Sequence, residues 1–336
     1  MIQIDYILRK IIFSLMTLAA VIVFNFFLFR IIPGDPIAMI SSPRMKPETR
    51  DLIREQYGLD KPIWLNLDAA REEDRFAAAF DSQFFYCLKN LSQGELGQSF
   101  RQKQPVADLI AMRLGPTILL ILTGEIAAIL LGITLGIIAA WKAKSKIDAL
   151  SMFVGLLAWS IPPFWMGIVL LTTARGYLPS GGYETIGAIF ESDLDRWLDI
   201  GRHLVLPALT MAITLFGSYI MVARSASLEV LAEDYILTAK AKGLSTFKIL
   251  WAHALKNAAL PLATVIALDL GYALGGAIQI ETIFSWPGIG RLMFDSIAQR
   301  DYPVLQGVFL LLAVSVILAN FLADLTYLLL DPRVEA

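Results

Sequence analysis

Four acidic side chains stand inside apolar stretches and are the first candidates for chemistry. Glu125 lies within TILLILTGEIAAILLG, and Asp269 and Glu281 lie within LATVIALDLGYALGGAIQIETIF. Asp324 lies in the last apolar stretch. A carboxylate in a membrane segment is costly and often marks a solute pathway. Pairing between helices, or snorkelling near a helix end, is the alternative. We favour that alternative for Glu125 and Asp324, and for Asp269 both interpretations stay open.

Other residue types that support catalysis or metal binding are few. The two histidines, His203 and His253, fall on opposite sides of the membrane in the topology that the apolar segments predict, and zinc-type spacing is absent. The single cysteine, Cys87, cannot form an internal disulfide and is interpreted as an incidental thiol. A phosphate-binding loop needs a Gly-Lys dipeptide, which the sequence lacks. We therefore predict no catalytic residue, no metal site and no cofactor in this chain.

The composition is typical of a polytopic membrane protein, with 57% hydrophobic and 17% charged residues and a mean hydropathy of +0.63. The net charge of −2 argues against a nucleic-acid partner. A bilayer core about 30 Å thick needs roughly 20 apolar residues per helix. The sequence thus predicts an all-α protein with six transmembrane helices, at about 11–31, 117–140, 150–174, 204–223, 262–284 and 305–330.

Basic residues in the short loops set the orientation. Lys142, Lys144 and Lys146 lie in one loop, and a second basic loop spans 224–261. The opposite loops carry fewer lysines and arginines, so we expect both termini to be cytoplasmic. The predicted organisation has three parts: a cytoplasmic N-terminus and first helix at 1–31, a large outer loop region at 32–116, and a five-helix core at 117–336 that contains the cytoplasmic loop 224–261.

The polar segment EDYILTAKAKGLSTFKILWAHALKNAALP, residues 233–261, interrupts the apolar spans. Helix formers run from Ser225 to Gly243, and a glycine there can take the left-handed conformation that ends a helix. Ser245 offers an N-cap for a second helix, which Pro261 would bound. We predict two cytoplasmic helices that meet at a sharp turn. The pattern alone leaves open whether they lie on anionic lipid or bind a soluble partner.

A set of motifs in a fixed order resembles one transporter family. DYILTAKAKGLS followed by HALKNAALP resembles the cytoplasmic EAA-type loop of bacterial ABC importer permeases of the dipeptide/oligopeptide/nickel family. The other matching motifs, in chain order, are FRIIPGDP, YGLDKP, GELGQSF, SIPPFW, HLVLPALT, ETIFSWPGIGRL, RDYPVLQG and DPR. Two departures stand out. Leu237, Thr238 and Ala239 replace the Glu-Ala-Ala triplet, and residues 64–87 form a longer outer segment that suggests an extra helix.

The resemblance implies a type I ABC importer permease in the bacterial inner membrane, with the outer loop region in the periplasm. Such a subunit forms half of the pathway for peptides or related small solutes. The implied partners are a second homologous permease, one or two cytoplasmic ATPases that bind ATP and Mg, and a periplasmic or lipid-anchored substrate-binding protein, all at a lipid membrane. Peptides are the first choice, with glutathione and nickel chelates still open. A secondary transporter would require internal repeats and an ion site of its own near the midplane, and we see neither clearly. A membrane enzyme would require clustered His, Asp or Ser residues at one membrane depth, which we do not find.

The resemblance also assigns residues to three roles. Predicted ATPase-coupling residues are Asp234, Tyr235, Thr238, Ala239, Lys240, Ala241, Lys242, Gly243, Leu244 and Ser245. The predicted translocation lining is Asp269, Gly271, Gly275, Gly276 and Glu281, although these glycines, like GITLG at 132–136, could simply allow close helix packing. The predicted outer gate or binding-protein surface is Trp286, Pro287, Gly288, Arg291, Asp301 and Tyr302, with plain interfacial anchoring as the alternative for the tryptophan.

Overall fold

The structure is a computed structural model of the 336-residue chain, and it describes residues 2–31, 60–72 and 75–330. Within these ranges the chain is helical and contains no named β-strand. Five helices are long and apolar enough to cross a membrane, or six if one bent helix pair counts as a single span. The all-α polytopic fold that the composition predicts is therefore confirmed. FRIIPGDP and DPR lie largely outside the described residues.

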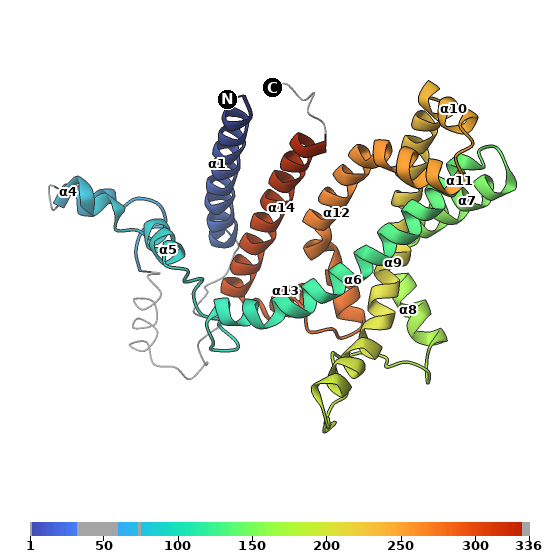
Figure 1. The fold of residues 1–336 in the computed structure, drawn as a ribbon. Helices are drawn as coiled ribbons and strands as arrows, with labels where there is room; N and C mark the ends of the chain where they lie inside the picture. Colours follow the sequence, from blue (N-terminus) through green and yellow to red (C-terminus); the bar gives the residue numbers. More distant parts are fainter. Residues whose placement is uncertain (1, 32–59, 73–74, 331–336) are drawn as a thin grey trace. The chain divides into compact units, whose positions relative to one another are not determined.

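The long helices, which are labelled in Figure 1, extend beyond the apolar stretches that predict them. They are α1 (Ile2–Ile31), α6 (Val106–Trp141), α9 (Asp193–Leu231), α12 (Leu255–Ile283) and α14 (Tyr302–Leu330). The 39 residues of α9 correspond to about 58 Å at 1.5 Å per residue, which exceeds a bilayer core of about 30 Å. Hydropathy locates only the part of a helix that lies in lipid. The predicted spans of 20 to 26 residues are therefore shorter than the helices that contain them.

The third predicted span, 150–174, is not one helix, and this corrects the sequence-based prediction. It consists of α7 (Lys146–Ser160) and α8 (Pro163–Thr173), which meet at an angle of 100°. The sequence SIPPFW explains the break. Proline has no N–H for the helix ladder, and it forces the residue before it into an extended conformation. Ile161 and Pro162 have ψ angles of 125° and 134°.

Short helices form the segments between the long ones. The 64–87 segment was expected to add one helix, but it holds α4 (Leu67–Glu72), the 3₁₀ turn η1 (Phe76–Phe80) and the first part of α5 (Gln83–Ser92). The Trp64 ring packs against Phe84 at 4.5 Å between centroids, and Lys61 forms an ion pair with Asp81. Because that carboxylate accepts from the Lys61 ammonium, the pKa of Lys61 is raised. A further short helix, α13 (Ile289–Gln299), precedes α14.

The chain divides into two compact units, one made of Met1–Leu15, Leu114–Arg291 and Val314–Ala336, the other of Met16–Arg113 and Leu292–Ala313. In the first unit, small residues let α6 approach α9 closely. A Cβ atom on Gly132 would lie 2.4 Å from Cβ of Tyr219, and one on Gly136 would lie 2.7 Å from Cβ of Ala223. The close packing expected for GITLG is thus confirmed. The predicted division of the chain into a cytoplasmic N-terminus with the first helix, an outer loop region and a five-helix core stays a prediction.

Candidate functional site

The sharp turn that the sequence predicts between Gly243 and Ser245 is present. Helix α10 (Asp234–Ala241) is capped by Lys242, and the next residue, Gly243, has a φ of +71° in the left-handed region. The Gly243 N–H donates to the Lys240 carbonyl at 3.0 Å, and the Leu244 N–H donates to the Ala239 carbonyl at 3.3 Å. This pair of bonds is a Schellman motif, which satisfies the last carbonyls of the helix. The turn is therefore specified by local backbone chemistry.

The second helix begins as predicted but does not end as predicted. Ser245 caps α11 (Thr246–Lys248) by accepting from the Lys248 N–H at 3.4 Å. The chain then passes through the π-helix η2 (Ile249–Ala254) into α12 without a break. Pro261 lies inside α12, so the expected boundary there is wrong. Membrane helices tolerate an internal proline when neighbouring groups satisfy the freed carbonyl, and a sequence pattern does not reveal such a rescue.

The inner side of this loop packs on the chain itself. Ile236, Ala239 and Ile249 form a buried cluster against which Trp141 and Leu244 pack. The Lys240 ammonium lies over the Trp141 ring, 5.1 Å from its centroid, in cation–π geometry. The sequence predicts that Ala239, Lys240 and Leu244 contact a partner, and this stays a prediction. In the structure the same residues make contacts that hold the loop to the end of α6.

The outer side of the loop presents large apolar side chains. Leu237 is 68% exposed and Phe247 is 71% exposed, and the Phe247 ring lies 6.0 Å from that of Trp251. Tyr235 is also exposed, and partial burial together with the Glu233 charge raises the pKa of its hydroxyl, which stays neutral. Sequence reasoning missed Leu237 and Phe247, although two large apolar residues in a lysine-rich segment were a usable signal. The other predicted coupling residues that are exposed are Asp234, Thr238, Lys240, Ala241, Lys242, Gly243 and Ser245.

An ion pair between Asp148 and Arg224 joins the start of α7 to α9. Asp148, near the start of α7, receives two hydrogen bonds from Arg224 of α9, from Nε at 2.5 Å and from a terminal nitrogen at 2.8 Å. The Lys144 N–H donates to the same carboxylate at 2.9 Å, and Ser145 caps α7. Because Asp148 is buried and its geometry is bidentate, this pair fixes α7 to α9 more firmly than an exposed ion pair would.

The carboxylates within the spans have distinct environments. Glu125 is buried and accepts a hydrogen bond from the Tyr219 hydroxyl, and Asp269 interacts with the same hydroxyl. One oxygen of each carboxyl, Oε2 of Glu125 and Oδ2 of Asp269, has no hydrogen-bond partner among the described residues. Asp324 pairs with Lys10 at 2.8 Å. The internal pairing favoured for Glu125 and Asp324 is thus confirmed.

The small residues after Asp269 do not share one environment. A Cβ atom on Gly271 would lie 2.8 Å from Cβ of Ala319, so this glycine permits close packing of α12 on α14. Gly275 is exposed, and a Cβ atom there would meet nothing within 4 Å. Gly276 belongs to α12, but its surroundings lie outside the described residues. Of the three glycines, only Gly275 is shown to be exposed.

Glu281 organises the turn that follows α12 and does not face an open surface. It is fully buried and accepts from the Thr117 hydroxyl at 2.7 Å and from the Arg291 N–H at 2.9 Å. A Cβ atom on Gly288 would lie only 2.1 Å from its Oε1, so glycine is needed for this close approach. Trp286 is also fully buried, and its indole N–H donates to the Pro116 carbonyl at 2.9 Å.

Asp301, at the start of α14, holds the GELGQSF segment. Its carboxylate accepts from the Ser99 hydroxyl at 2.5 Å and from the N–H groups of Phe100 and Arg101 at 2.9 and 3.2 Å. Asp301 is buried, and Tyr302 is half-buried. Of the residues predicted for the outer gate, Trp286, Gly288 and Asp301 are buried, whereas Pro287, Arg291 and Tyr302 are partly exposed. The three buried residues shape the turn after α12 and the 99–101 segment, and the surface is formed by their neighbours.

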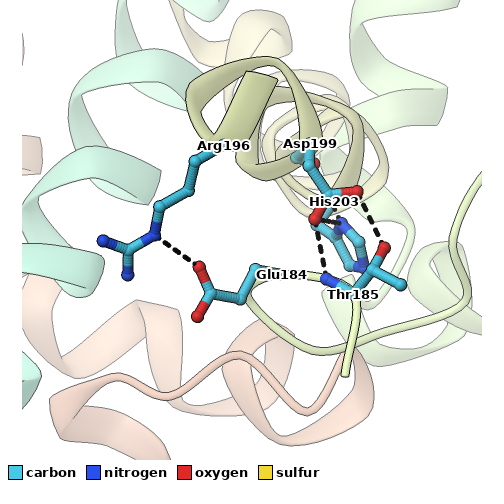
Figure 2. Close-up of polar contacts among 5 residues, drawn as sticks. All are labelled: Glu184, Thr185, Arg196, Asp199 and His203. Atoms are coloured by element: carbon cyan, nitrogen blue, oxygen red, sulfur yellow. Dashed lines mark hydrogen bonds and ion pairs between the residues drawn. The ribbon is translucent and has the colours of Figure 1, made fainter. Parts of the chain in front are cut away.

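The loop before α9 is fastened to that helix by a polar cluster that sequence reasoning did not find (Figure 2). Asp199 accepts from both the N–H and the hydroxyl of Thr185, each at 2.7 Å. His203 is buried, with Nδ1 2.9 Å from the Asp199 carbonyl oxygen. Arg196 and Glu184 form an ion pair at 2.8 Å. His203 therefore has a structural role here, and the described residues contain no group suited to hold a metal ion.

Comparison with known proteins covers nearly the whole chain. Residues 132–336 match the family described as the binding-protein-dependent transport system inner membrane component, and residues 1–121 match the N-terminal domain of the same kind of component. An oligopeptide transport system permease protein of Bacillus subtilis is 35% identical, covering 98% of this chain and 99% of its own length.

Two further relatives have similar coverage. A glutathione transport system permease protein of Escherichia coli K12 is 34% identical over 99% of both chains. A dipeptide transport system permease protein of Alkalihalophilus pseudofirmus is 34% identical over 98% of this chain and 99% of its own. Together with the apolar helices, these matches show that the chain belongs to the family of binding-protein-dependent transport system inner membrane components, the permease subunits of ABC importers.

Proposed function

We propose that this chain forms one half of an ATP-driven translocation pathway for peptides or small peptide-like solutes. The relatives that support this substrate class are named for oligopeptides, dipeptides and glutathione, which is itself a short peptide. A substrate-binding protein outside the membrane delivers the solute, and a second, homologous permease completes the pathway. One or two cytoplasmic ATPases bind ATP and Mg and hydrolyse the nucleotide.

The observation that carries the coupling role is the two-sided architecture of residues 233–251, which we name the coupling loop. Its inner side is fixed by the Ile236, Ala239 and Ile249 cluster, while its outer side exposes Leu237 and Phe247. Exposed large apolar residues on a rigid support are typical anchors of a protein interface. We assign these side chains to a groove of the ATPase, with Tyr235 and Lys242 at the rim.

Motion of the coupling loop reaches the membrane helices through contacts that the chain already makes. Lys240 lies over Trp141 at the end of α6, and η2 continues directly into α12, which carries Asp269. Closure of two ATPases around ATP would draw the coupling loops of the two permeases together and tilt these helices. ATP state and pathway state then bias one another through an element with two arrangements.

Asp269 is the residue of α12 that we place on the pathway. Its buried Oδ2 has no partner among the described residues, so it can accept a hydrogen bond from a passing solute, such as one from a peptide ammonium. Gly275 lies less than two helical turns further along and leaves open space at its α-carbon. We also propose that both termini are cytoplasmic, since Lys142 and Lys144 lie in the loop after Trp141, the residue that Lys240 contacts.

The experiment that tests this function is affinity purification of the full-length chain from its native host, with mass spectrometry of the associated proteins. Recovery of a second permease and one or two ATPases that contain phosphate-binding loops supports the proposal. Purified complex in proteoliposomes, supplied with the binding protein, should then take up radiolabelled peptide only with ATP. A chain recovered alone that transports without ATP would contradict it.

A further inference from the structure

A cavity of about 300 Å³ lies within the second unit, between the end of α1 and the start of α14. Helix α5 and the segment 95–100 complete its wall. From α1 the lining residues are Ile22, Asn25, Phe26 and Arg30, and from α14 they are Pro303, Gln306, Gly307 and Leu310. The helical spacing of these residues shows that the cavity follows both helices for about two turns, or roughly 12 Å.

The cavity has a polar end and an apolar end. Near it the two helices run antiparallel, since Asn25 donates to the Gln306 carbonyl at 2.9 Å while the Phe29 ring lies 6.3 Å from that of Tyr302. Arg30 therefore lies at the level of the start of α14, and Ile22 lies at the level of Leu310. One end presents a cation and the other presents branched aliphatic side chains that belong to the spans.

Two buried polar atoms in this wall have no hydrogen-bond partner among the described residues. The Arg30 Nε atom is buried and has no hydrogen-bond partner among the described residues. The guanidinium lies 5.3 Å from the Phe26 ring centroid, but none of the ion pairs among the described residues gives it a carboxylate partner. Asn25 is only 5% exposed, and its Oδ1 atom likewise has no partner there. Burying a guanidinium and an amide oxygen is unfavourable unless each is paired.

We propose that this cavity binds the phosphodiester headgroup of a membrane phospholipid. The Arg30 guanidinium donates to the phosphate oxygens, which match its fork geometry. Asn25 Oδ1 accepts from a headgroup hydroxyl, and an acyl chain leaves along Ile22 and Leu310 into the bilayer. The exposed Glu95 carboxylate also lines the cavity. It favours a phosphodiester with a single negative charge over a doubly charged phosphate monoester.

The chain carries its own reporter for occupancy of the cavity. Its single cysteine, Cys87, lines the wall, where the Gln306 side-chain amide donates to its sulfur at 3.7 Å. Burial raises the pKa of the Cys87 thiol, so alkylation by a maleimide is slow at neutral pH and becomes faster as the pH rises. A lipid in the cavity covers this sulfur and slows the reaction further.

The test is the rate of Cys87 alkylation in the full-length chain, purified with its associated subunits, stripped of lipid and read by mass spectrometry of this chain. Dioleoylphosphatidylglycerol should slow the reaction about tenfold at saturation, whereas dioleoylglycerol, which lacks the phosphate, should not. Arg30→Gln should abolish the protection by phospholipid. Arg202→Gln, which changes an exposed arginine of α9 outside the cavity, should keep it.

A second variant keeps the proposal falsifiable if Arg30→Gln does not fold. Ile22→Trp fills the apolar end, leaves the charge unchanged and should also reduce protection by phospholipid. Equal protection by both lipids, or protection that survives both variants, would overturn the proposal. Protection by inorganic phosphate alone, at the level that the phospholipid gives, would show a simple anion site and would also overturn it.

Discussion

Replacement of Gly243 probes the coupling loop through its backbone alone. The residue has φ +71°, and a Cβ atom at this position would meet nothing within 4 Å, so a larger side chain is not excluded by contact. The cost of substitution is the left-handed conformation itself, about 1–2 kcal/mol for an ordinary L-residue. A β-branched residue is a stronger outlier there, and asparagine tolerates the conformation best.

These costs predict an ordered series of variants. Gly243→Asn should bind the ATPase nearly as well as the parent, Gly243→Ala should lose about 5- to 30-fold, the equilibrium effect of 1–2 kcal/mol, and Gly243→Val should lose more. Gly201→Ala is a matched control, because Gly201 is helical in α9 and a Cβ atom there also meets nothing within 4 Å.

The assay is the concentration of purified ATPase that half-saturates the permease in nanodiscs, with ATP-driven peptide uptake measured in parallel. Because the strain acts on the turn, both readouts should fall in the same order. A Gly243→Val variant with parental affinity and uptake would refute the reasoning, since it would show that the left-handed turn has no part in docking.

Three further predictions concern the membrane helices and the turn after α12. Arg224→Met leaves the buried Asp148 carboxylate without its bidentate partner and should lower the unfolding free energy by about 1–3 kcal/mol, visible as a lower thermal midpoint; an unchanged midpoint would contradict it. Glu281→Ala removes the acceptor for the Thr117 hydroxyl and should destabilise the purified protein by a similar amount, whereas equal stability would show that the turn after α12 does not depend on it. Asp269→Ala should reduce peptide uptake while the complex still assembles, and a variant with intact uptake and stability would remove Asp269 from the pathway.

Local chemistry was predictable from the sequence wherever a single residue type decides the conformation. The left-handed turn at Gly243 and the N-cap at Ser245 follow from local rules, and both are present. The bend at Ile161–Pro162 had an equally local cause in two consecutive prolines, but apolar periodicity across the break concealed it. Pro261 shows the reverse case, because the same residue type is accommodated inside a continuous helix.

The burial of polar and aromatic residues was much less predictable. Trp286 and Asp301 lie in motifs that look like exposed turn sequences, yet each is buried by contacts with residues about 170 and 200 positions away. Their hydrogen bonds depend on how distant segments meet, which residue spacing does not encode. The same reason explains why Leu237 and Phe247 were missed. Their exposure depends on which face of the coupling loop packs against Trp141.

The most direct test of the central claim is photo-crosslinking from the coupling loop in native membranes. A photoreactive phenylalanine analogue at Phe247 should crosslink to the ATPase subunit, and the yield should change when ATP is trapped in the complex. The same analogue at Tyr177, which is exposed in the segment between α8 and α9, should not reach the ATPase. Crosslinks from Phe247 to lipid alone, with no ATPase adduct in either nucleotide state, would contradict the coupling role of this loop.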